Sequence, residues 1–210
     1  MADNYLEKRY AEVFGGAHKA VKQRPSLDTL LLKNRSYRGF DKSYVVHPRQ
    51  LEAMVAVNPK VASSVNRQCL RFRLVTKGET ADKVMSLVKM GRMLPELNLP
   101  FPGTEPEAFI VVCTTVKESP GVDIDLGISL QSMLLKAVEM GLGGLIIRNF
   151  DPAALKEALD LPLDPVAVVA VGKPAETIEL VTVREGESLK YYRKYGVHYV
   201  PKLPAEDLII

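Results

Sequence analysis

Two short, almost wholly apolar segments constrain the fold of this chain most strongly. Residues 109–114 have the sequence FIVVCT, and residues 166–171 have the sequence VAVVAV. Apolar segments of this length, bounded by turn residues, are typical of strands that are buried on both faces. We therefore predict an α+β fold in which helices wrap a central sheet.

The longest predicted helix covers residues 125–140. Asp123 and Asp125 are expected to supply a cap and favourable charge at its start, and Gly141 is expected to end it. Its apolar side chains recur at helical spacing and form one continuous stripe. The stripe consists of Leu126, Leu130, Met133, Leu134, Ala137 and Val138.

Shorter elements surround these segments. We expect helices after the N-cap Ser26, from Pro48 to Asn58, over residues 80–90 and after Asp151, with a broken helix over residues 4–23. Strands are expected over residues 70–74, where apolar and arginine side chains alternate, and over residues 144–147. The four prolines of residues 93–106 predict an irregular loop, and the tail from Glu176 onward is polar with scattered aromatic residues.

The composition limits the classes of function. A length of 210 residues suits one domain, and a net charge of +3 is too small to indicate a nucleic-acid or membrane partner. No apolar run approaches the ~18 residues of a membrane helix, and the polar N-terminus predicts no secretory signal, so a cytoplasmic location is expected. Cys69 and Cys113 have no metal spacing and are expected to be buried packing thiols, while His18, His47 and His198 are expected to be structural or exposed.

Two polar segments carry residue types that suit ligand binding. Arg35, Ser36 and Arg38 lie within four residues at the expected end of a helix, and guanidinium groups match phosphate with paired hydrogen bonds. The alternative is a solvated basic turn. Residues 62–68 combine small hydroxyl side chains with Asn66 and Gln68, which could bind the edge of a planar heterocycle or simply form a polar loop.

Two glycine-containing segments add weaker signals. Gly141, Gly143 and Gly144 could let a ligand approach the backbone, or could only end a helix and form a tight turn. Gly172 and Lys173 follow a strand, where the lysine could neutralise a phosphate or be an ordinary surface residue. The chain lacks the glycine patterns of dinucleotide-binding and P-loop sites.

Taken in order, these segments resemble the nitroreductase family. Arg-Ser-x-Arg-x-Phe at residues 35–40 is followed by Ser-Ser-x-Asn-x-Gln at residues 63–68. An Asp-x-Gly-x-x-x-Gln helix then leads to Gly-Leu-Gly-Gly at residues 141–144, and Val-Ala-Val-Gly-Lys-Pro completes the pattern at residues 169–174. The resemblance covers roughly residues 27 to 174, and its specificity lies in the combination of the motifs.

The resemblance implies a mainly antiparallel sheet, an intertwined homodimer and FMN bound at the dimer interface. Residues 25–210 would form the FMN-binding domain and residues 1–24 an N-terminal extension. Arg35, Ser36 and Arg38 would hold the phosphate and ribityl chain, while Gly172 and Lys173 would close the phosphate end. Residues near the flavin ring would come in part from the partner subunit. The ring would be approached by Ala62, Ser63, Ser64, Val65, Asn66, Gln68, Ile147 and Arg148.

The implied activity is the transfer of electrons from NADH or NADPH, through FMN, to a small nitroaromatic or quinone acceptor in two half-reactions. It requires no catalytic side chain and no metal. The chain departs from the family at Asn34, Ala62, Cys69 and Arg148, and Arg148 near the flavin could stabilise the anionic reduced form. Arg184 is a further candidate for the phosphate. Three alternatives stay open: a flavin-dependent oxidase or dehydrogenase, a non-catalytic FMN-binding protein, and an interaction module that binds no flavin.

Overall fold

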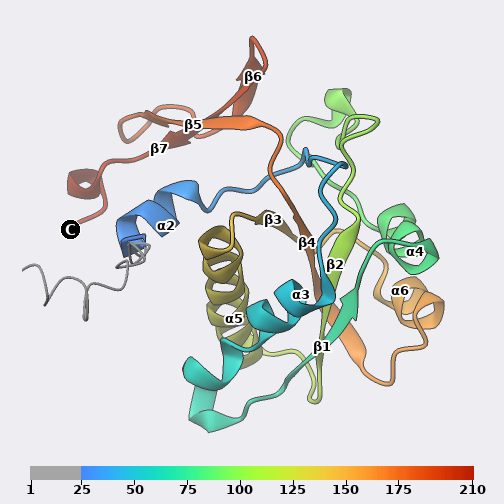
Figure 1. Cartoon of the computed structure of the whole chain (residues 1–210). Coiled ribbons are helices and arrows are strands. Elements are labelled where there is room, and N and C mark those ends of the chain that lie inside the picture. The colour runs from blue at the N-terminus through green and yellow to red at the C-terminus, as the bar shows by residue number, and fades with distance from the viewer. Residues whose placement is uncertain (1–24) are drawn as a thin grey trace, which may run out of the picture.

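The computed structural model describes residues 25–210 and contains a central four-stranded sheet (Figure 1). Its strands are β1 (Leu70–Val75), β2 (Ala108–Thr114), β3 (Gly143–Ile147) and β4 (Asp164–Gly172). They lie in the order β1-β2-β4-β3, and every neighbouring pair is antiparallel. The predicted α+β class is confirmed, and the two apolar segments form the two central strands, which are the ones that helices can cover on both faces.

Helices cover both faces of this sheet. One face packs against α3 (Pro48–Val55) and α5 (Pro120–Glu139), and the other against α4 (Glu79–Leu87) and α6 (Pro152–Ala158). Because side chains alternate along a strand, Ile110 of β2 belongs to the α5 core, while its neighbour Phe109 belongs to the α4 and α6 core. The two cores hold the sheet in place and leave its strand ends free to carry a site.

The long helix α5 starts earlier than predicted. It begins at Pro120, and the Ser119 hydroxyl accepts a hydrogen bond from the Val122 amide at 3.5 Å. The prediction that Asp123 and Asp125 cap the start was therefore wrong, because serine followed by proline supplies the cap. Asp123 does lie in the first turn, where the predicted negative charge is favourable. Gly141, with φ of +77°, ends the helix as expected.

Most of the shorter helices agree with the sequence. The helix α2 (Leu27–Lys33) is capped by Ser26, and α6 is capped by Asp151, whose carboxylate accepts two backbone N–H groups. The prediction for α4 was too long, because Val88 leaves the helix and forms a β-bridge with Phe150. Four short 3₁₀ helices cover Asn58–Lys60, Ser64–Asn66, Pro95–Leu97 and Ala205–Asp207.

A second sheet, which the sequence did not predict, is formed by the C-terminal segment. It contains β5 (Thr177–Thr182), β6 (Tyr192–Lys194) and β7 (Val197–Lys202) in the order β5-β7-β6. The strand β7 pairs in parallel with β5 and antiparallel with β6. This sheet lies over α2 and the segment that follows it (Figure 1), so it forms a second wall beside the predicted phosphate-binding residues.

The broken helix predicted over residues 4–23, together with His18, lies outside the described residues. Within residues 25–210, no helix is long and apolar enough to cross a membrane. The same residues contain no group of three or more His, Cys, Asp or Glu side chains that could hold a metal ion. Cys69 and Cys113 are buried free thiols, as expected.

Candidate functional site

The segment that follows α2 is fastened to the ends of two sheet strands. The Tyr37 amide donates to the Gly144 carbonyl at 3.1 Å, and the Asp41 amide donates to the Lys173 carbonyl at 2.9 Å. Ser36 also forms a β-bridge with Gly144. Three of the four segments singled out in the sequence therefore meet at one end of the sheet.

The glycines at this end serve close packing of that segment. A Cβ added to Gly143 would lie 2.5 Å from Cδ2 of Tyr37, and one added to Gly172 would lie 2.6 Å from Cδ1 of Phe40. Any side chain at either position would push the aromatic ring away from the sheet. The two glycines thus hold residues 35–40 in position, and their faces are covered by Tyr37 and Phe40 rather than open to a ligand.

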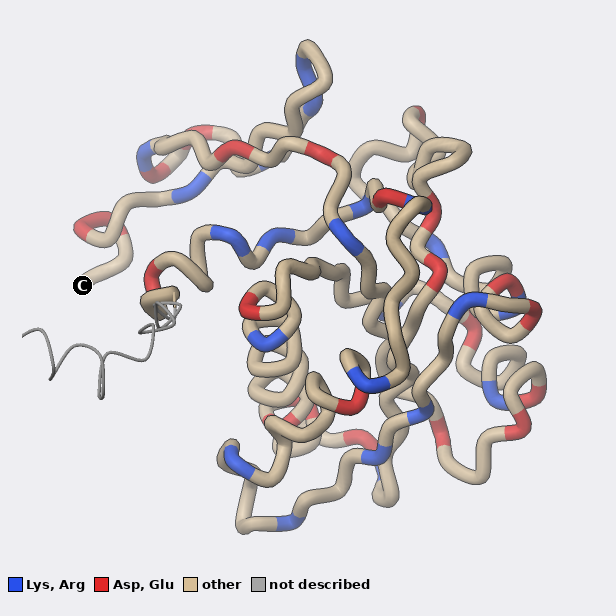
Figure 2. The backbone as a smooth tube through the Cα atoms, in the orientation of Figure 1, with Lys and Arg blue, Asp and Glu red and all other residues tan. Residues whose placement is uncertain are grey.

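A cavity of about 240 Å³ lies between this segment and the second sheet, and we call it the anion cavity. In Figure 2 several basic positions follow one another along the segment after α2, beneath the second sheet. Within residues 25–210, the lining contains three cationic side chains and no carboxylate. It consists of Asn34, Arg35, Ser36, Arg38, Ile178, Tyr191, His198, Val200 and Lys202.

Two arginines in the lining have hydrogen-bonding capacity to spare. Arg35 donates to the Leu31 carbonyl at 2.7 Å, and Arg38 donates to the Ser36 carbonyl at 3.0 Å. The buried Nε atoms of both arginines have no partner within residues 25–210. Buried donors are nearly always satisfied in native proteins, so an anionic ligand with several acceptor oxygens fits this cavity.

His198 lies in the same wall and is 2% exposed. Its ring is 5.0 Å from that of Tyr191, and its Nδ1 has no partner in the described part of the chain. Burial lowers the pKa of His198 to about 4, helped by the positive charges of Arg193 and Arg38 and opposed by Glu176. The imidazole is therefore neutral at pH 7 and adds hydrogen-bonding capacity to the cavity without adding charge.

Glu176 connects the anion cavity to the second sheet. Its carboxylate accepts the backbone N–H groups of Arg38 and Gly39, the latter at 3.1 Å, and forms an ion pair with Arg193 of β6. The Glu176 side chain is 7% exposed and the Arg193 side chain 15%. Burial lowers the pKa of Arg38, while Tyr191 and Glu176 raise it. Glu176 thus holds the backbone of Arg38 in place and also lies close enough to its guanidinium group to affect the pKa of Arg38.

The third cation of the cavity is Lys202, which the sequence interpretation missed. His198, Val200 and Lys202 all line the cavity because alternate residues of β7 face the same way. The alternation of these residues was the available signal, but it needs a predicted strand to be useful.

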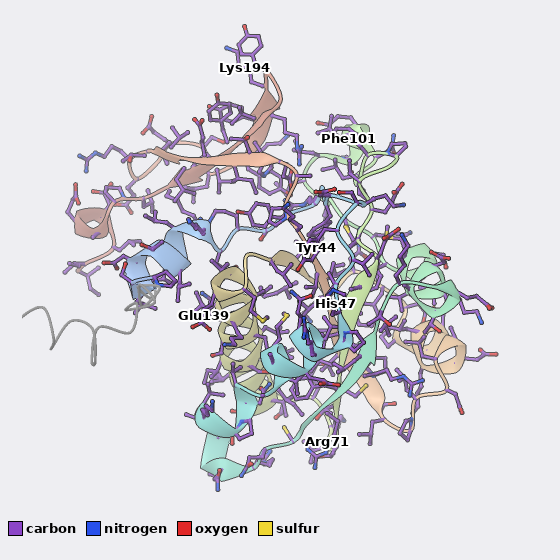
Figure 3. The ribbon with its side chains drawn as sticks, viewed as in Figure 1. Tyr44, His47, Arg71, Phe101, Glu139 and Lys194 are labelled. Carbon is purple, nitrogen blue, oxygen red and sulfur yellow. The ribbon has the colours of Figure 1, made fainter. Side chains whose placement is uncertain are left out.

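The two cations proposed from the sequence for the phosphate end lie elsewhere. Lys173 does not line the cavity: its ammonium group is 3.8 Å from the Asp41 carboxylate and 5.8 Å from the ring centroid of Tyr44, labelled in Figure 3. Arg184 forms ion pairs with Glu206 and Asp207, each at 3.1 Å. Both side chains are thus engaged by carboxylates of this chain.

Residues 62–68 lie at the other end of α5. The Ser64 amide donates to the Asp125 carboxylate at 2.6 Å, in the first turns of that helix. Gly144, which pairs with Ser36 and Tyr37, packs against Leu134, which lies further along α5. Asp125 and Leu134 are about 13 Å apart along the axis at ~1.5 Å per residue, and Figure 1 shows the two segments at opposite ends of α5. Within one chain, the two groups of predicted FMN contacts do not meet.

The loop of residues 62–68 is exposed and conformationally strained. Val65, Asn66 and Gln68 have φ values of +46°, +54° and +49°, a region that costs free energy for residues other than glycine. Val65 is 82% exposed. The loop is held by Asp125 and, within itself, by a 2.9 Å hydrogen bond from the side-chain Nε2 of Gln68 to Oδ1 of Asn66. Such an anchored, outward-facing loop is well suited to contact another molecule.

Ile147 is the last residue of β3, and Arg148 follows it near the start of α5. The Ile147 side chain is buried in the core beside α4 and α6, so only its backbone is available to a ligand. Arg148 forms ion pairs with Glu118 and, at 2.9 Å, with Asp123, and these carboxylates raise the pKa of Arg148. Its charge is thus already balanced within this chain.

Comparison with known proteins identifies relatives of this arrangement. The sequence model of one family, the Nitroreductase family, matches residues 31–173. No curated protein sequence matches the chain. A nitroreductase family protein from Clostridium difficile 630 is 25% identical, with a TM-score of 0.56, covering 70% of this chain and 83% of that one.

Two more distant solved structures share the fold. A nitroreductase family protein from Streptococcus pneumoniae TIGR4 is 17% identical, with a TM-score of 0.63 over 88% of this chain and 99% of that one. The FMN and NADPH-dependent nitroreductase NfnB from Sphigopyxis sp. strain HMH is 16% identical, with a TM-score of 0.60 over 72% of this chain and 89% of that one.

Proposed function

Because the chain belongs to the nitroreductase family, we propose that it is an FMN-dependent oxidoreductase that passes electrons from NADH or NADPH to a small organic acceptor. The observation that carries this proposal is the anion cavity of about 240 Å³. Three cationic side chains line it, and two of them have Nε atoms without a partner in residues 25–210. A phosphate monoester has the negative charge to pair with these cations and the acceptor oxygens to accept their hydrogen bonds.

The phosphate of FMN is bound by Arg35, Ser36 and Arg38 from one wall and by Lys202 from the other. Gly172 and Lys173 lie beside this site, where Gly172 keeps Phe40 against the sheet and Lys173 adds a more distant positive charge. Residues 25–210 constitute the FMN-binding domain, and residues 1–24 are an extension of it.

The flavin ring is enclosed with the help of a second copy of the chain. Ala62, Ser63, Ser64, Val65, Asn66 and Gln68 are about 13 Å along α5 from the strand end that holds the phosphate, so we assign them to the partner's site. The exposed apolar side chains of α2 and α5 support this dimer, because burying them would be favourable. They include Leu27, Leu31, Leu32 and Ile124, with exposed fractions of 62%, 41%, 65% and 63%.

The chain's own residues bind, orient and enclose, while FMN when bound supplies the capacity to accept a hydride and pass electrons on. At the ring, the backbone of Ile147 and Arg148 lies along the strand edge. The balanced charge of Arg148 weakens the idea that this side chain stabilises a reduced flavin.

The test is an absorbance spectrum of the purified, FMN-supplemented protein, taken before and after anaerobic addition of NADH or NADPH. Flavin bands that bleach with the nicotinamide and return with a quinone or nitroaromatic acceptor are the expected result. Bands that persist would favour an oxidase, a dehydrogenase or a storage protein. Failure to bind FMN at all would overturn the proposal.

A further inference from the structure

A second cavity, of about 420 Å³, lies on the other side of Arg38. It is bounded by the proline-rich loop of residues 93–106 and by the turn between β6 and β7, and we call it the β6 cavity. Arg38 lines both cavities, so the β6 cavity directly adjoins the proposed phosphate site. Phe101 and Lys194 project from these two boundaries at the top of the molecule in Figure 3.

The β6 cavity combines aromatic rings with cations. The guanidinium carbon of Arg193 lies 5.6 Å from the centroid of the Phe101 ring, and the ammonium group of Lys194 lies 5.0 Å from that of Tyr195. All four side chains line the cavity. Tyr195 is 89% exposed and Phe101 41%, so a planar ligand can reach both rings beside the cations that lie over them.

The charge of the cavity is positive. Its one carboxylate, Glu176, is occupied by Arg193 and by two backbone N–H groups. Lys194 forms no ion pair within residues 25–210, and the buried Nε of Arg193 has no partner there. An anionic group on the ligand would therefore meet the unpaired charge of Lys194, together with the Arg193 guanidinium, whose charge is paired with Glu176 but whose Nε has no partner in the described residues.

We propose that the β6 cavity binds an aromatic anion, meaning a planar ring that carries a phosphate or carboxylate group. Phe101 and Tyr195 contact the ring, and Lys194 with Arg193 contacts the charged group. This inference rests on the proposed function, because the β6 cavity adjoins the proposed phosphate site of FMN. The aromatic anion is either the adenosine monophosphate end of the nicotinamide donor, which lies away from the reacting nicotinamide ring, or a separate aromatic carboxylate.

Titration calorimetry on the FMN-loaded protein tests the proposal, because bound FMN fills the anion cavity. The probes are two anions, AMP and 4-nitrobenzoate, and their neutral counterparts, adenosine and 4-nitrobenzamide. We expect one of the anions to bind at least about tenfold more tightly than its neutral counterpart, the factor expected from one charge-assisted contact. The anion that binds identifies the source.

Lys194→Ala should weaken that anion about tenfold and leave the neutral counterpart unchanged. Tyr195→Ala should weaken both members of the pair. The matched control is Lys190→Ala, an exposed lysine of the same tail that does not line the cavity. Equal binding of anion and neutral compound, no binding of any probe, or no effect of Lys194→Ala would each overturn the inference.

The proposed function fails by a different signal. If NADH and NADPH do not bleach the flavin while Lys194-dependent anion binding persists, the nicotinamide-driven activity is wrong and the β6 cavity stands. If bleaching occurs but the probes do not bind as described, only the β6 cavity is disproved.

Discussion

Arg38 is the residue on which most of the site's contacts converge. Its backbone N–H is held by Glu176, its guanidinium group lies 5.2 Å from the Tyr191 ring centroid, and its side chain lines both cavities. The guanidinium is planar and permanently charged, whereas a lysine offers only a point charge. Substitutions of Arg38 can therefore distinguish the contribution of its positive charge to phosphate binding from the contribution of its planar hydrogen-bonding geometry.

Arg38→Ala should weaken FMN binding by about 10- to 100-fold, the range expected for the loss of charge-assisted hydrogen bonds. The FMN affinity of Arg38→Lys should lie between that of Arg38→Ala and that of the original protein. Lysine keeps the positive charge but lacks the planar guanidinium group that donates two parallel hydrogen bonds. The dissociation constant is measured by quenching of flavin fluorescence. Arg49→Ala, which removes an exposed arginine outside both cavities, is the control. Equal losses in Arg38→Ala and Arg49→Ala would contradict a specific phosphate contact.

His198 should make the apoprotein less stable in acid. Its pKa is lowered to about 4 in the folded chain against 6.5 for the free side chain, so the unfolded chain binds the proton first as the pH falls. The stability due to the neutral imidazole is complete above pH 6.5 and is lost between pH 6.5 and about 4, by roughly 3 kcal/mol at most.

The measurement is urea unfolding at several pH values in that window. His198→Phe keeps a ring beside Tyr191 and cannot titrate, so its free energy of unfolding should fall less steeply with acid. A parallel pH dependence in the two proteins would show that another group is responsible.

At the scale of elements, the second sheet is attached to the phosphate-binding segment through one buried carboxylate. Glu176→Gln would leave the positive charge of Arg193 buried without its partner, which typically costs about 3 kcal/mol or more. It would also weaken the hold on the backbone of Arg38 and Gly39. We expect a lower melting temperature together with weaker FMN binding.

Glu179→Gln is the matched control, because Glu179 is an exposed carboxylate on β5. Thermal unfolding and FMN titration are measured on both variants. A Glu176→Gln protein that loses stability but binds FMN with unchanged affinity would show that the second sheet is dispensable for the phosphate site.

The elements that could be predicted from the sequence are those with a strong burial pattern. Every residue of β2 is buried, as is every residue of β4 except Asp164, so their apolar sequences identified them directly. The strands β5 and β6 are mostly exposed and pair only within their own small sheet. Without a buried face, they carry no clear alternation, and the second sheet could not be predicted.

The site was predictable where it depended on local motifs and not where it depended on distant contacts. Arg35 and Arg38, which the basic motif singled out, do line one cavity together, and their contact with phosphate stays a prediction. Lys202 and His198 join them only because β7 is placed beside residues 35–38 by the fold. The same limit explains Lys173, whose side chain direction depends on its contact with Asp41.

At the scale of the whole molecule, the predicted FMN contacts are divided between two ends of α5. One chain offers the anion cavity at one end and the strained loop of residues 62–68 at the other. In two copies related by a two-fold axis, the loop of each copy would reach the cavity of the other, which gives two equivalent sites. The proposed site therefore requires the proposed dimer, which would also account for the exposure of the loop.

Ile124 provides the test, since it is 63% exposed and lies in the first turns of α5, the end of the helix at which Asp125 holds the loop. Ile124→Glu places a charge in the proposed interface, so we expect the protein to become monomeric and, because the loop of the second copy is then missing, to bind FMN at least tenfold more weakly. Sedimentation velocity gives the oligomeric state and flavin fluorescence gives the affinity. Val45→Glu, at a residue that is 46% exposed and outside α2, α5 and the loop, should remain dimeric and bind normally. A monomeric Ile124→Glu protein with unchanged FMN affinity would mean that one chain binds the cofactor alone, and the assignment of residues 62–68 to the partner's site would then be wrong.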